Sequence, residues 1–517
     1  MKARRWLYLT HRWLGIVLCL LVAMWFFSGV VMIYVGFPEL SRQERLGALP
    51  PLDPETLRVG PGALLSQTAP GGVGELRLSP VLGRPAWLLR DGAGAWRGLF
   101  ADSGEVFGRF GPGEALLAAG LYASAAGIPA ATGRLEYRGL LDMDQWSVSG
   151  SLHPHRPLHR VALGDPGHTE VYVSSVTGEV VRDTSAMERR WNWLGANLHW
   201  IYPVQLRRHP TVWHWVIVVL SLAGLFSILT GTVIGLLRLR LRRRYRGTDA
   251  SPSRGTMKLH HILGLVFILP LSTYMLSGLL SMNPWGVFSD QIPFGRQLSA
   301  YRGRAGASDA PAIDIDMASL RPALAVIPGT REVMWQWLGE KSYPYAVTGD
   351  GRRQLLAFPG GQARLRKTAL DQLREVMPGQ AILAVERLDD YDSYYYSHHQ
   401  RWRPLPVLRV RFGDPAGSWF HIDLSTGELI NRLTARGRAE RWLYHGLHSL
   451  DFRFLLDRRP LWDAVVIVLC AAGFVFSITA IIVSWRRLRP GHRRTMTRKH
   501  WRAIPPSDKR LNPGRQA

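Results

Sequence analysis

The chain has 517 residues, with 64 Lys and Arg against 39 Asp and Glu, and its formal net charge is +25. A positive charge of this size suits either a nucleic-acid partner or a membrane surface. Four uncharged stretches, at 14–37, 212–237, 262–287 and 464–485, are each long enough to cross a bilayer core of about 30 Å. The charge is therefore explained by membrane topology, and we expect an integral membrane protein with no nucleic-acid partner.

The basic residues cluster beside these stretches, at 2–12, 238–246 and 486–502. By the positive-inside rule these clusters lie in the cytoplasm, together with both termini. The first apolar run is longer than the apolar core of a signal peptide, so we expect a retained helix. Cys19 and Cys470 are the two cysteines, and both lie in apolar runs, so we expect no disulfide framework outside the membrane.

In chain order the sequence predicts a cytoplasmic N-terminus with transmembrane helix 1 at 1–37, a first external domain at 38–211 and helix 2 at 212–237. A basic cytoplasmic loop at 238–257, helix 3 at 258–288, a second external domain at 289–460, helix 4 at 461–485 and a basic tail at 486–517 follow. We expect a bacterial inner membrane with both large domains in the periplasm.

Short patterns predict the contents of the external domains. "VYVSSVTGEVV" at 171–181 and "FHIDLSTGELI" at 420–430 alternate apolar and polar residues around a Thr-Gly turn, which is typical of a β-hairpin. "RLEYRGL" at 134–140 and "LRKTALDQLREVM" at 365–377 indicate at least one helix in each domain. We therefore expect two small α+β domains.

The sequence contains an internal duplication, because many residues recur 249 positions later in the same order. The matches include His11/His260, Ser28/Ser277, Gly29/Gly278, Thr177/Thr426, Trp193/Trp442, Leu198/Leu447 and His199/His448. Both copies have the same predicted orientation, so a pseudo-twofold axis along the membrane normal should relate them. The expected fold class is a membrane α-helical protein, in which a duplicated four-helix transmembrane bundle carries the two α+β domains.

The duplication supplies two pairs of equivalent histidines. His11 and His260 stand at the cytoplasmic ends of helices 1 and 3, and His199 and His448 stand just outside the membrane ahead of helices 2 and 4. A lone histidine there would be a cap or an interfacial side chain, but facing pairs need another explanation. Two imidazoles make a poor zinc site, whereas haem asks the protein only for axial ligands. We expect one b-type haem in each leaflet, with His214, His261 and His445 as reserve ligands.

Glycines and basic residues accompany these histidines. Gly15 and Gly264 lie one helical turn after His11 and His260, where a missing side chain would leave room for a flat macrocycle. Gly29 and Gly278 lie 18 residues beyond those histidines, about 27 Å along a helix. Close helix packing is the alternative explanation. The residues near enough in sequence to meet haem propionates are Arg12, Lys258, Arg189 and Arg438. Arg12 and Lys258 are also explained as flanking charges that set the orientation of the helices in the membrane.

At this point the sequence resembles a known family. "HRWLG" at 11–15, "RPLHRV" at 156–161, the "TGE" hairpins, "LHW" and "LHS" are similar to those of the PepSY-associated transmembrane family of bacterial inner-membrane proteins, over nearly the whole chain. Within it, the chain resembles di-haem siderophore reductases of the ferrioxamine reductase type. The resemblance implies two haem b groups held by His11, His199, His260 and His448. "YHGLHS" departs from "GANLHW" and makes His445 a second candidate for one outer ligand.

The implied function is that of a ferric-siderophore reductase, which passes electrons across the membrane to a ferric chelate and releases iron because Fe(II) binds hard oxygen ligands weakly. No flavin or nicotinamide fingerprint is present, so membrane quinol or a cytoplasmic reductase must be the donor. The protein itself would supply no catalytic side chain. "DDYDSYYYSHHQRWR" at 389–403 and "HPHRPLH" at 153–159 could contact the siderophore or could be ordinary surface loops.

Two other functions stay open. The first is a permease or adaptor that moves the chelate or iron without redox chemistry. The second is a peptidase-regulating module, because PepSY-like domains are associated with peptidase inhibition. Four helices without buried carboxylates are few for a permease. A regulatory module would leave the matched histidines without a purpose. A visible spectrum of the purified protein would separate both from the reductase.

Overall fold

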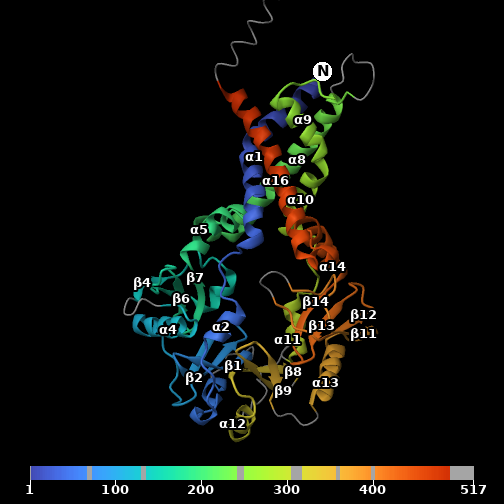
Figure 1. Cartoon of the computed structure of the whole chain (residues 1–517). Coiled ribbons are helices and arrows are strands. Elements are labelled where there is room, and N and C mark those ends of the chain that lie inside the picture. Colours follow the sequence, from blue (N-terminus) through green and yellow to red (C-terminus); the bar gives the residue numbers. More distant parts are fainter. Residues whose placement is uncertain are drawn as a thin grey trace, which may run out of the picture. The chain divides into compact units, whose positions relative to one another are not determined.

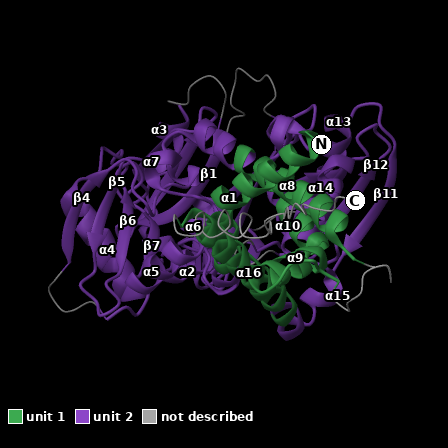
Figure 2. Cartoon of the chain, turned by 90° about the horizontal axis from the view of Figure 1, so that it is seen from above, with its two compact units in different colours: residues 1–27, 219–276, 464–517 green, residues 28–218, 277–463 purple. Residues whose placement is uncertain are grey.

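The computed structural model describes residues 2–66, 73–129, 135–240, 250–303, 317–339, 341–356, 361–397 and 402–489. The chain divides into two compact units, which Figure 2 colours green and purple. Unit 1 comprises Met1–Phe27, Val219–Leu276 and Ala464–Ala517, and unit 2 comprises Ser28–Val218 and Ser277–Asp463. Each unit therefore draws residues from both predicted repeats. Parts of the predicted basic loop and tail, at 241–249 and 490–517, lie outside the described residues.

Long apolar helices form the described part of unit 1 and continue at some ends into unit 2 (Figure 1). Three helices are long and apolar enough to cross a membrane: α1 (Lys2–Tyr34), α8 (Pro210–Arg238) and α16 (Arg459–Leu488). A fourth span is present if α9 (Thr256–Val266) and α10 (Ile268–Ser281) count as one bent span. In a bilayer only helices or closed barrels satisfy the backbone, which is why such apolar runs form helices.

The third predicted helix is broken. We expected one span over 258–288, but α9 and α10 meet at Phe267 with a bend of 66°. Pro270 explains the break, because it has no N–H to donate to the carbonyl of Val266 and its ring clashes with that carbonyl. The matching position of α1 holds Leu21, and α1 runs without interruption.

Glycines let the helices of unit 1 approach closely. A Cβ added to Gly473 would lie 2.5 Å from the ring of Phe26, and one added to Gly224 would lie 2.8 Å from Met275. Phe26 in turn meets Tyr274 edge to face, with 6.0 Å between ring centres. Small residues at helix crossings are the usual means of association in lipid, where the hydrophobic effect does not draw helices together.

Unit 2 is built around a six-stranded sheet that both repeats share. Its strand order is β10-β9-β8-β1-β2-β3. The first repeat supplies β1 (Val73–Val81), β2 (Arg84–Asp91) and β3 (Trp96–Phe100), and the second supplies β8 (Thr330–Leu338), β9 (Lys341–Thr348) and β10 (Arg353–Leu355). We expected two separate external domains, yet the antiparallel pair of β1 and β8 joins their strands into one sheet.

The two sets of three strands start 257 positions apart, with Val73, Arg84 and Trp96 matching Thr330, Lys341 and Arg353. At this offset Arg77 matches Met334, and these two residues are also register partners across the β1–β8 pair. Equivalent positions that pair with each other are what a local twofold axis through the middle of a sheet produces.

Each repeat also has its own four-stranded antiparallel sheet. The first contains β4 (Glu136–Leu141), β5 (Leu158–Ala162), β6 (Glu170–Ser174) and β7 (Val180–Thr184), and the second contains β11 (Ile382–Leu388), β12 (Val407–Phe412), β13 (Trp419–Asp423) and β14 (Leu429–Leu433). The two predicted hairpins are confirmed as β6–β7 and β13–β14. Gly178 and Gly427 have positive φ angles of 69° and 73°, which a turn residue with a side chain rarely adopts.

One helix packs on each of these sheets. The prediction for 365–377 is confirmed by α13 (Gly361–Val376), whose Leu365, Ala369 and Leu373 face the second core at helical spacing. The prediction for 134–140 is wrong, because residues 136–140 lie in β4, where exposure alternates residue by residue. Arg134 lies outside the described residues. The helix of the first repeat is instead the Ala-rich α4 (Pro112–Ala125).

Short helices connect these elements. They are α2 (Arg42–Ala48), α3 (Gly62–Leu65), α5 (Ala186–Leu194), α6 (Ala196–His199), α7 (Val204–Arg207), α11 (Phe294–Tyr301), α12 (Met317–Ala325), α14 (Ala435–Glu440) and α15 (Arg453–Leu456), with 3-10 turns η1 (Pro54–Thr56), η2 (Gly150–His155) and η3 (Pro284–Gly286) and a π-helical turn η4 (Arg441–Gly446).

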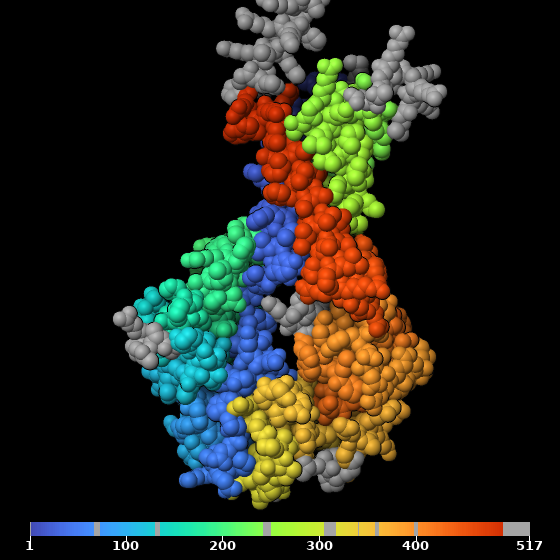
Figure 3. All heavy atoms as spheres, viewed as in Figure 1, coloured from blue at the N-terminus to red at the C-terminus, as the bar shows by residue number. Residues whose placement is uncertain are grey.

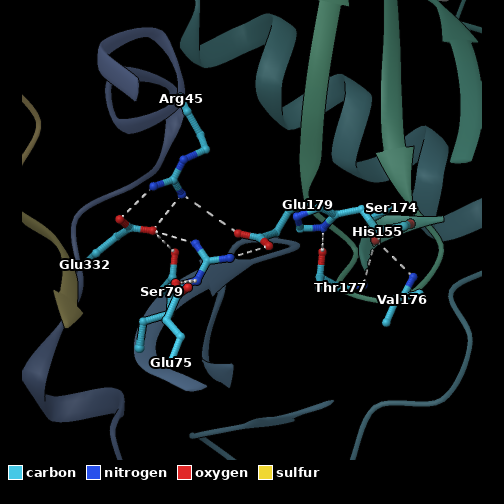
Figure 4. Close-up of polar contacts among 10 residues, drawn as sticks. Arg45, Glu75, Ser79, His155, Ser174, Val176, Thr177, Glu179 and Glu332 are labelled. Carbon is cyan, nitrogen blue, oxygen red and sulfur yellow. Dashed lines mark hydrogen bonds and ion pairs between the residues drawn. The ribbon is translucent and has the colours of Figure 1, made fainter. Parts of the chain in front are cut away.

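A buried ion cluster lies at the junction of the two repeats, and Figure 4 shows it beside the hairpin of the first one. Glu332 of β8 is 0% exposed and accepts two hydrogen bonds from Arg45 of α2, at 2.6 and 2.8 Å. It also accepts from Arg77 at 3.0 Å and from the Ser79 hydroxyl at 2.9 Å. Arg77 continues to Glu179 of the "TGE" turn, with 2.7 Å between Nη2 and Oε2. Two arginines thus balance two buried carboxylates from different repeats, while the half-buried Glu75 adds a longer contact to Arg77 at 3.7 Å.

Replacing Glu332 by glutamine should destabilise unit 2. The change keeps the shape of the side chain but removes one of the two balancing negative charges, which for a buried pair costs about 3 kcal/mol. Thermal unfolding of the full chain in detergent measures the loss. Glu105→Gln is the control, because Glu105 pairs with Arg84 at the surface with 63% of its side chain exposed, and we expect a change below about 1 kcal/mol. Equal effects of the two variants would contradict the structural role of the cluster.

A second test uses His421 of β13, which is 0% exposed. Arg409 donates from Nε to Nε2 of His421 at 2.8 Å, and Nδ1 of His421 lies 2.7 Å from the side-chain amide oxygen of Asn431. The neutral ring satisfies both contacts. Burial and the charge of Arg409 lower the pKa of His421 to about 3. The unfolded chain binds this proton below about pH 6.5 while the folded chain does not, so stability should fall as pH falls from 6.5 toward 3.

Between pH 6.5 and pH 5 the expected loss from His421 is about 2 kcal/mol. Denaturant unfolding at these two pH values measures it, and the variant His421→Gln should lose this part of the pH dependence because its amide does not titrate. An unchanged pH dependence in the variant would show that other groups cause it.

Candidate functional site

The structure brings His199 and His448 together in unit 2. His199 ends α6, and His448 follows η4 by two residues. The centres of the two imidazole rings are 6.0 Å apart, and their planes meet at 70°. These two residues come from the two repeats, at matching positions. The reserve position His445 lies in η4, where its ring is 4.6 Å from that of Tyr444, so the ring that faces His199 is that of His448.

A buried serine hydroxyl contacts the Nδ1 nitrogen of each of these rings. The hydroxyl of Ser28 lies 3.1 Å from Nδ1 of His199, and that of Ser277 lies 3.1 Å from Nδ1 of His448. Both serines are 0% exposed and stand at matching positions, on α1 and α10. Both rings therefore contact a hydroxyl at Nδ1, and a metal would be bound through Nε2.

The spacing of this pair fits a bis-histidine haem site. Two metal–nitrogen bonds of about 2.0 Å, and about 1 Å from each ring centre to its nitrogen, require ring centres about 6 Å apart. The observed separation is 6.0 Å. Gly278 adds space beside the pair, since even a Cβ there would lie 3.7 Å from Cε1 of His448. The separation of 6.0 Å is the one that two imidazoles sharing one metal ion would have, so His199 and His448 are the residues that would hold a haem iron here.

The second pair lies in unit 1. His11 of α1 places Nδ1 3.1 Å from the Ser227 carbonyl oxygen and 3.4 Å from the Thr230 hydroxyl, both on α8. His260 of α9 places Nδ1 3.0 Å from the Thr479 hydroxyl of α16. Thr230 and Thr479 are themselves 249 positions apart.

The hydroxyl geometry assigns the tautomers of this pair. A hydroxyl has one proton to donate. Thr479 donates it to the Phe476 carbonyl, and the partners of Thr230 include the Phe226 and Ser227 carbonyls, at 3.0 Å each. In both histidines Nδ1–H therefore donates to the threonine oxygen. In His11, Nδ1 also lies against the Ser227 carbonyl, which can only accept, so Nδ1 must carry the proton there as well. Nε2 carries the lone pair in both rings, as an iron ligand must.

The glycines near this pair differ from the expected ones. A Cβ added to Gly15 would meet nothing within 4 Å, so Gly15 lies against no described neighbour. Gly264 lies against Phe476, whose ring stacks on that of His260 with 5.0 Å between centres. The glycine beside His11 is Gly231, where a Cβ would lie only 2.6 Å from Cε1. Sequence reasoning missed Gly231, Phe476 and the two threonines, although the match of Thr230 with Thr479 at the repeat offset was readable.

The other reserve histidines have other contacts. His261 uses both ring nitrogens, with Nδ1 2.8 Å from the Ser251 hydroxyl and Nε2 2.9 Å from the Gly235 carbonyl oxygen. A ring in this state has no nitrogen left for a metal. His214 meets Trp215 edge to face at 5.4 Å.

The four basic residues considered for haem propionates divide into two kinds. Arg189 donates to the Thr184 and His168 carbonyls, and Arg438 donates to the Leu433 and Gly417 carbonyls. These matched arginines therefore fasten strand ends to the preceding loops. Arg12 lies 5.5 Å from the ring of Trp13, and Lys258 lies on α9 two residues before His260.

The two candidate docking segments are largely used in packing. His159 is buried, with its nitrogens 2.9 Å from the Tyr137 hydroxyl and 2.8 Å from the Phe110 carbonyl oxygen. Tyr395 and Tyr396 are buried and donate to the Pro404 carbonyl and the Asp451 carboxylate. Residues 398–401 of the second segment lie outside the described residues. Within the described part of the chain, no group of three or more His, Cys, Asp or Glu could hold a metal ion.

The threonine contacts give a stability test. Thr479→Val removes the acceptor of the His260 Nδ1–H and leaves a buried donor unpaired, which costs about 1–3 kcal/mol. Thr230→Val should cost less, because His11 keeps the Ser227 carbonyl. Thr232→Val is the control, since the Thr232 hydroxyl donates to the Ile228 carbonyl at 2.8 Å. Thermal unfolding in detergent should rank Thr479→Val as most damaging, and a ranking with Thr232→Val first would refute the assignment.

Comparison with known proteins agrees with the architecture described above. Residues 8–377 match the family described as the PepSY-associated TM region. A comparison with curated proteins found no match. The family match extends over more than half of the 517 residues. The chain belongs to the PepSY-associated transmembrane family.

Proposed function

We propose that this protein is an inner-membrane di-haem b reductase that delivers electrons to a ferric siderophore and thereby releases its iron. The observation that carries the proposal is the pair of facing imidazoles of His199 and His448, 6.0 Å apart and each held at Nδ1 by a buried serine. The threonine-held histidines His11 and His260 are its counterpart in unit 1.

The proposal includes the membrane arrangement expected from the sequence. The two repeats form a four-helix bundle with an internal pseudo-twofold axis, both termini are cytoplasmic, and the large β-containing segments are periplasmic. The recurring strands at an offset of 257 and the Arg77–Met334 register pair support the duplication. The bent pair of α9 and α10 acts as the third of four spans.

In this function Nε2 of each histidine would hold a haem iron, and the serine and threonine hydroxyls at Nδ1 would orient each ring. Bound haem would supply one-electron transfer between a donor and the ferric ion. The donor is a membrane quinol or a cytoplasmic reductase. Ferric iron gains one electron, and the resulting Fe(II) leaves hydroxamate or catecholate oxygens because it is a softer ion. Ferrioxamine, a hydroxamate, is the siderophore of the reductases that the sequence resembles, and this resemblance does not by itself fix the chelate that this chain takes.

The visible spectrum of the purified full chain tests this proposal. We expect a red protein with about two haems per chain, of which one is lost in His11→Ala or His260→Ala and the other in His199→Ala or His448→Ala. His261→Ala is the matched control, because both of its nitrogens are engaged elsewhere, and it should keep both haems. A colourless protein expressed with adequate haem supply would overturn the proposal and favour a permease, an adaptor or a peptidase-regulating module.

A turnover measurement then tests the reaction itself. The reduced protein in detergent is mixed with a ferric siderophore and a chromogenic chelator specific for Fe(II), and re-oxidation of the haem bands should follow the same time course as Fe(II) appearance. Absence of Fe(II) from a haem-loaded protein would argue against siderophore reduction.

A further inference from the structure

A pocket of about 570 Å³ opens in the second repeat beside the helical turn that leads to His448. Ser393, Trp442, Phe452, Arg453, Phe454, Asp457 and Arg458 line it. Its size falls within the range of small-molecule sites. The segment that carries these residues reaches the surface in the space-filling view, where residues near 450 are orange-red (Figure 3), and Arg453, Phe454, Asp457 and Arg458 are exposed.

The corresponding place in the first repeat is crossed by a hydrogen-bonded side chain, that of Gln145. Asp144 and Asp392 occupy equivalent positions, because each accepts the backbone N–H groups two and three residues ahead and pairs with a matched arginine, Arg160 or Arg409. The next residue is Gln145 in the first repeat and Ser393 in the second.

The side chain of Gln145 bridges the surrounding elements. It donates to the Asn197 side chain at 2.7 Å and to the Tyr202 carbonyl at 2.6 Å, and it accepts from the Val204 N–H at 2.9 Å. In the second repeat Ser393 is too short to do this, and Gly446 stands where Asn197 stands in the first. A glutamine therefore bridges these elements in the first repeat, and a serine borders the pocket in the second.

The lining of the pocket is also particular to the second repeat. Phe452, Phe454 and Arg458 stand where the first repeat has Pro203, Gln205 and His209. The first repeat has its own aromatic cluster in this segment, in which Tyr202 lies 5.1 Å from Trp200 and 5.3 Å from Trp213. The second repeat differs in presenting the exposed side chains of Phe454 and Arg458 together.

The chemistry of the lining defines a ligand. Trp442 and Phe452 stack at 6.1 Å, and Phe452 and Phe454 stack at 5.9 Å, so the three rings form one stack that ends at the exposed ring of Phe454. The Trp442 indole is fixed by its hydrogen bond to the Tyr394 hydroxyl at 3.2 Å. Arg453 is paired with Asp457 at 3.4 Å, whereas Arg458 has no acidic partner among the residues that the structure describes. Stacked rings beside an uncompensated guanidinium suit an anionic aromatic group.

We infer that this pocket docks ferric chelates whose iron is held by aromatic oxygen donors, catecholate or phenolate, with net negative charge. The inference rests on the proposed reductase function and names the substrate class of its outer site. Trp442 and His448 are six residues apart along one helical stretch, about 9 Å, so a chelate in this pocket would lie near the histidine pair of unit 2. An aliphatic hydroxamate chelate offers no ring to stack, and a neutral quinol gives Arg458 no charge to meet.

The test is a calorimetric titration, in which gallium(III) tris-catecholate is added to the full-length protein in detergent and the heat of binding is measured. Gallium is not reduced, so binding is measured whether or not the protein carries haem. Ser393→Gln, which installs the residue of the first repeat, and Arg458→Ala should each weaken binding by at least about tenfold. The matched controls Ser393→Ala and His209→Ala should bind as the unchanged protein does.

Absence of gallium-chelate binding to the unchanged protein would overturn the inference and leave the proposed function standing. So would a Ser393→Gln variant that binds normally, or a hydroxamate chelate or quinone analogue that binds as tightly and with the same sensitivity to that change. Should Ser393→Gln fail to fold by circular dichroism, Arg458→Ala decides alone. A colourless protein that still binds the chelate would refute the reductase and keep the pocket.

Discussion

The pairing of β1 with β8 is the contact on which unit 2 depends. It converts two sets of three strands into one sheet, and it brings Glu332 of one repeat against Arg45 and Arg77 of the other. A carboxylate without solvent is stable only with its counter-charges in place, so the two repeats must be assembled together before the cluster is satisfied. The same cluster reaches the "TGE" turn through Glu179, which fixes the first small sheet to the shared one.

Much of the architecture and of the candidate site follows from local patterns. Uncharged runs gave the spans, alternation around Thr-Gly gave both hairpins, and the offset of 249 singled out His11, His199, His260 and His448 together with Ser28 and Ser277. These features can be predicted from the sequence because each depends on residues close together in the chain or on a comparison of one repeat with the other. The structure adds that the matched serines meet the matched histidines.

The rest depends on contacts that a single sequence does not display. The break at Phe267 comes from one proline in an otherwise regular apolar run, and "RLEYRGL" is too short for its period to decide between helix and strand. The shared sheet needs a pairing between residues more than 250 positions apart. Gly15 was chosen by helical spacing from His11, but Gly231 on another helix is the glycine that meets that ring, and only packing reveals which helix lies there.

The hydroxyl partners of the histidines bear on the driving force of the proposed electron transfer. An imidazole N–H that donates to a neutral hydroxyl gives its ring less electron density than one that donates to a carboxylate, so the metal is held by a less basic ligand. Weaker donation favours the ferrous over the ferric state and raises the reduction potential. A tightly bound ferric chelate is harder to reduce from a high potential. Electron transfer to the chelate would then be unfavourable unless the Fe(II) that leaves the chelate is removed rapidly.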